Sequence, residues 1–139
     1  MINFFFEDCE STSFIDEKQL LKTPQVVEKE GFNMGFLNII FCSDRYLLLL
    51  NRQYLNHDYF TDIITFPFVD EKIISGDLFI SLDRVSENAE TQNVSKQKEL
   101  ARVVIHGILH LCGYNDKQEE EVITMRTKEK EYLSLIGFT

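Results

Sequence analysis

The stretch VVIHGILHLCGYND, residues 103–116, places two of the chain's three histidines four positions apart in an apolar segment. Side chains four positions apart in a helix lie on one face, about one turn from each other. His106 and His110 are therefore expected to project together. The segment is apolar on nearly every side, which is typical of a buried helix. Gly107 has no side chain, so a neighbouring backbone is expected to approach the helix closely there.

A metal site would explain why two histidines occupy a buried helix. A buried imidazole needs a hydrogen-bond partner or a metal, and one cation satisfies two neutral imidazoles. Gly113 is suited to end the helix, and Asp116 follows His110 by six residues, so the turn can return a third ligand. His106, His110 and Asp116 would form a three-ligand set like those of catalytic zinc sites. The hypothesis is one Zn²⁺ per chain, whose bound water is the nucleophile for hydrolysis.

Each of these residues also has a structural interpretation. An isolated pair of histidines at this spacing is explained about equally well by packing. Asp116 precedes Glu119 by three residues, so it could instead be the N-cap of a following helix. Cys112 lies on a different face of the helix from His106 and is expected in the core. His57 lies in a polar loop and is expected at the surface.

Composition and charge limit the classes of function. The chain has 139 residues, of which 44% are hydrophobic and 12% aromatic, so one domain over residues 1–139 is expected. Its net charge of −9 is opposite to that of most nucleic-acid-binding surfaces. RNA or DNA would have to be bound through a local basic patch, a metal ion or a partner.

Cysteine usage and the N-terminus indicate the compartment. The chain has three cysteines, Cys9, Cys42 and Cys112. An odd number without a Cys-x-x-Cys pair favours a reducing, cytoplasmic environment. The first ten residues lack the basic region of a signal peptide, and no apolar run is long enough to span a bilayer. No membrane contact is expected.

The succession of patterns predicts an α/β (α+β) domain with a small mixed four-stranded sheet and about five helices. Strands are expected in β-branched and aromatic runs, at residues 2–8, 36–42, 63–69 and 76–81. Pro67 places the third of these at a sheet edge or a bulge. Helices are expected in periodic segments with caps, at residues 16–30, 44–56, 82–93, 95–111 and 117–135. In the first of these, Pro24 interrupts the helix or marks a first turn. In the second helix, the residues expected to face inward are Leu47, Leu50, Tyr54 and Leu55.

Three blocks of the sequence are similar to those of the YbeY family, the metal-dependent endoribonucleases of ribosomal RNA maturation. HGILHLCGYND, residues 106–116, resembles the family signature HGxLHLxGYDH. LNRQYLNHDYFTDIITFPF, residues 50–68, resembles its LNxxY…DxxTDVLSFP block, and GDLFIS, residues 76–81, resembles its GDIxIS block. The blocks occur in the family's order, and the resemblance covers most of the chain.

The resemblance implies a zincin-like fold, in which a small mixed sheet lies beside the metal helix. It carries the family's three metal ligands onto His106, His110 and Asp116, the last of which is a histidine in the family signature. The arginine that the family commonly has before its DxxTD block falls on Leu55, which cannot clamp a phosphate. Arg52, one helical turn away, is a candidate replacement in substrate binding and is otherwise a solvated charge.

A substrate and partners are also implied by the resemblance. The strand at residues 63–69 would border the cleft, where Phe66 and Phe68 could stack on unpaired bases or belong to the core. The implied function is a single-strand-specific endoribonuclease in ribosomal RNA processing, maturation and ribosome quality control. Its partners would be ribosomal RNA and the small ribosomal subunit or a ribosomal protein.

Two other functions are weighed against this one. The altered third ligand, Leu55 and the acidic charge favour a metal-stabilised ribosome-biogenesis binding module with little hydrolytic activity. A zincin-type peptidase or amidohydrolase is disfavoured, because Gly107 stands where the HExxH motif has its catalytic glutamate.

Overall fold

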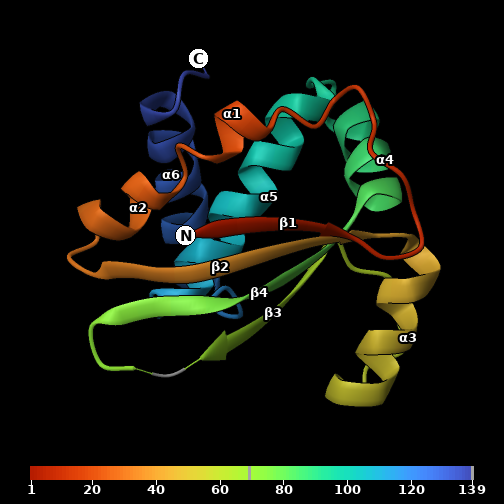
Figure 1. The fold of residues 1–139 in the computed structure, drawn as a ribbon, viewed down its shortest axis with the longest axis horizontal. Coiled ribbons are helices and arrows are strands. Elements are labelled where there is room, and N and C mark those ends of the chain that lie inside the picture. The colour runs from red at the N-terminus through yellow and green to blue at the C-terminus, as the bar shows by residue number, and fades with distance from the viewer. Residues whose placement is uncertain (69, 139) are drawn as a thin grey trace.

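Four strands form one mixed sheet in the computed structural model, which describes residues 1–68 and 70–138. The strands are β1 (Ile2–Phe6), β2 (Asn33–Cys42), β3 (Ile63–Phe68) and β4 (Ile73–Ser81), in the order β1-β2-β4-β3 (Figure 1). β2 pairs in parallel with β1 and β4, whereas β3 pairs antiparallel with β4. β3 is an edge strand, as Pro67 predicted. Val69, the last residue of the predicted strand, lies outside the described residues.

Six helices occur in the described part of the chain. They are α1 (Glu17–Leu20), α2 (Pro24–Lys29), α3 (Asp44–Leu55), α4 (Leu82–Gln92), α5 (Lys96–Leu111) and α6 (Glu119–Leu135). The segment 16–30 forms two helices and not one, and the interruption or first turn expected at Pro24 is confirmed, because Pro24 opens α2 and cannot continue α1. The other four predicted helices are confirmed to within two residues at each end. None of the helices in the described ranges combines the length and apolarity needed to cross a membrane.

One side of the sheet is covered by the helices α1, α2, α4, α5 and α6 (Figure 1). The main core lies between this helical layer and the sheet. α5 is the central helix of this layer, as its apolar sequence predicted. Its fully buried side chains include Val103, Val104, Ile105, Ile108 and Leu109. They pack with buried residues of the two central strands, among them Leu37, Ile39, Phe41, Leu78 and Ile80. This packing sets the position and rotation of α5, and with it the direction of the two histidines.

α3 packs through a second, smaller apolar cluster. Its buried members are Cys42, Leu47 and Ile64, with Tyr46, Leu50, Phe66 and Phe79 packed against them. The inward direction expected for Leu47 and Leu50 is confirmed. The same expectation is wrong for Tyr54 and Leu55, which are 60% and 42% exposed, although the Tyr54 ring still packs edge-on against Phe66 of β3.

The contact at Gly107 differs from the sequence expectation. A Cβ built at this position would meet side-chain atoms, at 2.7 Å from Ile63 Cδ1 and 3.0 Å from Leu78 Cδ2. The close neighbours are therefore side chains of the sheet and not a backbone. Gly107 lets the sheet side chains pack directly against α5.

Gly76→Ala is expected to destabilise the fold by about 1–3 kcal/mol. A Cβ on Gly76 would lie 2.8 Å from the Phe66 carbonyl oxygen, and that backbone cannot move without disturbing the β3–β4 pairing. Chemical denaturation of the two proteins measures the difference. Gly107→Ala is the control: it should cost less, because the side-chain ends that it meets can shift. A larger loss in the control would contradict this account.

Candidate metal centre

The C-terminal turn of α5 returns the chain toward the two histidines. Gly113 has a φ of +105°, the left-handed conformation predicted for a residue that ends a helix. The N–H groups of Gly113 and Tyr114 donate to the carbonyls of His110 and Leu109, both at 3.0 Å. These hydrogen bonds fold the loop over the end of α5, and Asp116 thereby reaches the face that carries the histidines.

Three potential ligand atoms form a nearly equilateral triangle. His106 Nε2 lies 3.0 Å from His110 Nε2. Asp116 Oδ2 lies 3.2 Å from His106 Nε2 and 3.3 Å from His110 Nε2. Tetrahedral zinc ligands at about 2.0–2.1 Å from the metal are about 3.3 Å from one another. The structure thus brings the three predicted residues together as a group that could bind a metal ion, with a spacing that fits zinc.

Hydrogen bonds on the far side of each imidazole leave the Nε2 atoms available as ligands. His110 Nδ1 donates to the Tyr114 carbonyl at 2.9 Å, and His106 Nδ1 donates to Glu129 Oε2 at 2.7 Å. A carbonyl and a carboxylate accept but do not donate, so in neutral imidazoles both Nε2 atoms carry lone pairs. Two such lone pairs at 3.0 Å face each other and a carboxylate oxygen. A cation between them removes that repulsion.

Glu129 supports this arrangement from α6. Its side chain is 2% exposed, and besides His106 it accepts hydrogen bonds from Arg102 at 3.0 Å and Arg126 at 3.2 Å. Burial alone would raise the pKa of Glu129, but the hydrogen bond from His106 and the charge of Arg102 hold it below its usual value. Glu129 is therefore an ionised acceptor that fixes the orientation of His106.

The alternative role of Asp116 as a helix N-cap is wrong. α6 begins at Glu119, and its N-cap is Gln118, whose backbone N–H donates to Glu121 Oε1 at 2.8 Å. Asp116 lies before this cap, with Oδ2 directed at the histidines. The carboxylate is thus free of a capping role and belongs to the triangle.

The three ligand atoms open into a pocket of about 540 Å³, here called the metal-site pocket. Its lining residues are Leu55, Thr61, Asp62, Ile63, Ile64, Thr65, Arg102, His106, His110, Asp116, Lys117 and Arg126. The strand predicted to border the cleft, β3, forms one wall. Burial raises the pKa of Asp62, against the opposing charge of Arg102.

Sequence reasoning missed several residues of this site. Glu129, Arg102, Arg126, Lys117 and Asp62 were not recognised, because each reads as an ordinary charge on a helix or loop. A signal was present in the amphipathic α6, where Glu129 falls in the same stripe as the buried Met125 and Tyr132. A carboxylate in an apolar stripe is expected to be buried, and a buried carboxylate needs a hydrogen-bond donor or a cation as its partner.

The residues considered for substrate binding lie in different places. The Arg52 side chain is exposed and forms an ion pair with Asp58, and Arg52 does not line the metal-site pocket. Phe66 packs between Tyr54 and Phe79, with ring centroids 5.9 and 5.7 Å away, which favours its interpretation as a core residue.

The structure also shows the surroundings of three other residues that the sequence singled out. Phe68 is half exposed and packs edge-on against Phe36. Cys112 packs against the main core, as expected, and burial raises its pKa to about 12. His57 is exposed, and its Nδ1 lies 2.9 Å from the Tyr59 hydroxyl.

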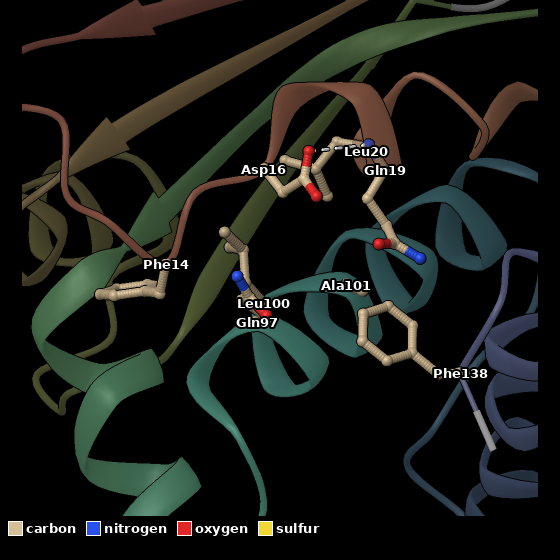
Figure 2. A pocket seen from close by; sticks show the side chains of 8 residues that line it. All are labelled: Phe14, Asp16, Gln19, Leu20, Gln97, Leu100, Ala101 and Phe138. Atoms are coloured by element: carbon tan, nitrogen blue, oxygen red, sulfur yellow. Dashed lines mark hydrogen bonds between the residues drawn. The ribbon is translucent and has the colours of Figure 1, made fainter.

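A separate hollow between α1 and α5 is too small for a substrate. Figure 2 shows its lining, which is mainly apolar and includes Phe14, Leu20, Leu100 and Phe138. Its volume is about 10 Å³, which is at most the space of one water molecule. It has no link to the metal triangle.

Glu30 ties the loop of the metal centre to the helical layer. Its carboxylate accepts hydrogen bonds from the hydroxyls of Tyr114, at 2.5 Å, and Tyr132, and from Lys128 at 3.2 Å. Burial alone would raise the pKa of Glu30, but these donors hold it below its ordinary value. Tyr114 is thereby held at its side-chain hydroxyl by Glu30, while its backbone carbonyl orients His110.

Glu30→Gln is expected to lower the free energy of unfolding by about 1–3 kcal/mol at pH 7. The folded-state pKa of Glu30 lies below its ordinary value of 4.5, so its stabilisation is complete above about pH 4.5 and declines as the pH falls through the folded value. Urea denaturation of both proteins from pH 7 to pH 3 measures the difference. A difference that grows on acidification would contradict this assignment.

Comparisons with known proteins find similar chains over most of this sequence. A family model described as "Endoribonuclease YbeY" matches residues 8–137. Proteins described as "Endoribonuclease YbeY" from Flavobacterium psychrophilum and Flavobacterium johnsoniae are both 46% identical to this chain. The alignments cover 94% and 97% of this chain and 89% and 96% of those proteins. The solution structure of a Thermotoga maritima protein is 33% identical, with a TM-score of 0.70, and the match covers 98% of this chain and 89% of that one.

Proposed function

This chain belongs to the endoribonuclease YbeY family, and from that premise we propose that it is a metal-dependent endoribonuclease that cleaves single-stranded RNA in ribosomal RNA processing and quality control. The observation that carries the proposal is the triangle of His106, His110 and Asp116 at the base of the metal-site pocket. Its edges of 3.0–3.3 Å and its fixed imidazoles suit one zinc ion.

The residues of the chain have distinct tasks in this proposal. His106, His110 and Asp116 hold the ion, while Glu129 and the Tyr114 carbonyl keep the two imidazoles in the ligating tautomer. The bound ion would supply Lewis acidity toward a phosphate oxygen and toward water. The pocket is open and partly polar along β3, so an unpaired RNA strand can enter, whereas a rigid duplex would need to lose pairing first.

Cleavage assays with purified protein test the proposed function. We expect zinc-loaded protein to cut a single-stranded RNA and to cut the same sequence much more slowly in a duplex. Chelation should remove activity and added zinc should restore it. Cleavage that survives complete removal of metal would refute a metal-dependent mechanism. Full zinc occupancy without cleavage of either RNA would favour the binding module with little hydrolytic activity.

Ribosomal RNA and a component of the small ribosomal subunit are the proposed partners, and activity is proposed in the cytoplasm. The net charge of −9 opposes long-range attraction to RNA. Binding to naked RNA is therefore expected to be weak at physiological salt and stronger on the ribosomal particle. Fluorescence anisotropy with labelled RNA, with and without small subunits, measures this. Tight, strongly salt-dependent binding to naked RNA would contradict the recruitment proposal.

A further inference from the structure

Three basic side chains line the metal-site pocket, which is unexpected in so acidic a chain. They are Arg102, Lys117 and Arg126, against the carboxylates of Asp62 and Asp116. The three cations differ in what else they contact. That difference decides which of them is available to a substrate.

Arg102 is fully engaged within the protein. Its side chain is 13% exposed, and its guanidinium donates twice to Glu99, at 2.9 and 2.8 Å, and once to Glu129, at 3.0 Å. A third carboxylate, that of Asp62, has its Oδ2 atom 3.5 Å from Arg102 Nη2. Burial opposes the charged form of Arg102, but these carboxylates raise the pKa of its guanidinium above the ordinary value. Arg102 therefore serves to hold Glu129 and Glu99.

Arg126 is held in place but remains available. Its side chain is 57% exposed, and its contact with the described residues is a single hydrogen bond from Nη1 to Glu129 Oε1, at 3.2 Å. Arg102 already shares that oxygen. The remaining donors of the planar guanidinium of Arg126 are therefore free for an acceptor with two oxygens, such as the two non-bridging oxygens of a phosphodiester. Lys117, exposed on the same pocket, adds a second positive charge.

The position of Arg126 links it to the metal centre. Glu129 binds Arg126 through Oε1 and His106 through Oε2, so one buried carboxylate sets both the ligating imidazole and the arginine. Leu55 also lines the pocket, and it offers no charge. Of the three cations that line the pocket, Arg126 on α6 and Lys117 in the loop before α6 are the exposed ones that an entering RNA backbone can meet.

We propose that Arg126, assisted by Lys117, binds an RNA phosphate next to the metal centre and supplies the phosphate contact that Leu55 cannot make. This inference rests on the proposed function, since it assumes that RNA is the substrate. Glu129 fixes the guanidinium before substrate arrives, which reduces the entropy lost on binding. The residue would touch substrate directly and would act mainly on its affinity.

The test uses the chain of residues 1–139 with the substitution Arg126→Gln or Arg126→Lys. The glutamine removes the charge but can still donate to Glu129, and the lysine keeps the charge without the two-pronged geometry. Arg45→Gln is the matched control, because Arg45 is exposed on α3 and does not line the pocket. We measure zinc content, KM and kcat on a single-stranded RNA, and the affinity of metal-free protein for the same RNA at several salt concentrations.

Arg126→Gln is expected to lower kcat/KM roughly tenfold to a hundredfold, mostly through KM, with zinc content unchanged. Arg126→Lys should lie between this variant and the wild type, and Arg45→Gln should match the wild type. In metal-free protein, the slope of log affinity against log salt should become shallower by about 0.7 for the lost phosphate contact. Kinetics and salt slope like those of Arg45→Gln would overturn the inference, and so would loss of zinc from Arg126→Gln, which would indicate that Arg126 only positions Glu129.

The outcomes separate this inference from the proposed function. If wild-type protein with zinc does not cleave RNA, the proposed function fails, and the metal-free salt slopes still decide whether Arg126 binds phosphate. If wild type cleaves RNA and Arg126→Gln does so equally well, the function stands and the inference fails.

Discussion

His110→Ala is expected to abolish stoichiometric zinc binding and RNA cleavage together. The substitution removes one corner of the triangle, whose Nε2 lies 3.0 Å from His106 and 3.3 Å from Asp116. Two remaining ligands cannot complete the three-ligand set of a catalytic zinc site. The loss of zinc affinity should exceed the roughly tenfold to hundredfold typical of changes outside the ligand set. Metal analysis and competitive zinc titration measure it, beside the cleavage assay.

A matched control is His57→Ala. His57 is exposed on the loop after α3 and does not line the metal-site pocket. This variant should retain zinc and activity. Equal loss in both histidine variants would show that the effect does not come from the triangle.

Variants of Asp116 decide the identity of the third ligand. Asp116→Ala should lose zinc as His110→Ala does, whereas Asp116→His should retain it, because imidazole is also a zinc ligand. Zinc in wild type and Asp116→Ala alike would leave a two-histidine site with another ligand. No metal in any sample would count against the metal-dependent enzyme and would favour a binding module that does not need metal.

The second large effect is expected for Glu129→Ala, which should lower the free energy of unfolding by about 3–5 kcal/mol. Glu129 is 2% exposed and receives hydrogen bonds from His106, Arg102 and Arg126. Its removal leaves Arg102 partly unpaired in a buried position and frees the imidazole of His106 to rotate. Both consequences arise from one carboxylate, so stability and metal binding should fall together.

Glu129→Gln separates the two consequences. The amide keeps the shape of the side chain, so it should cost less stability than alanine. It should still weaken zinc binding roughly tenfold to a hundredfold, because a neutral acceptor holds His106 less strongly. Thermal unfolding of metal-free protein and zinc titration provide the two measurements. Unchanged zinc affinity in Glu129→Gln would show that the carboxylate does not orient the ligand.

Glu131→Ala provides the control on the same helix. The Glu131 side chain is 61% exposed and lies 4.0 Å from Lys128, so its loss should change stability by well under 1 kcal/mol. A loss comparable with that of Glu129→Ala would point to a general effect of charge on α6.

Local signals in the sequence determined much of the fold and identified the first two candidate ligands. The spacing of His106 and His110 within an apolar segment placed both on one face of a buried helix. Gly113 marked where this helix ends, and Pro67 marked the edge strand. These features depend on helical periodicity, backbone conformation and the missing N–H of proline, which are properties of neighbouring residues.

Other features required the tertiary structure. The exposure of Tyr54 and Leu55 depends on how α3 meets the sheet. Asp116 had two equally local interpretations, as a cap and as a ligand. Only the packing of α6 on α5, with Gln118 as its cap, separates them.

The charged residues around the metal centre show most clearly that contacts between distant parts of the chain cannot be predicted from local sequence. Glu129 reaches His106 across 23 positions of sequence, and no local pattern records which buried partner an acidic residue meets. Its role and that of Arg126 arise from the contact between two helices, which is a non-local property of the fold. The sequence by itself determined which residues are candidate metal ligands, and the tertiary structure decided which side chains orient those residues and which cation of the pocket stays exposed.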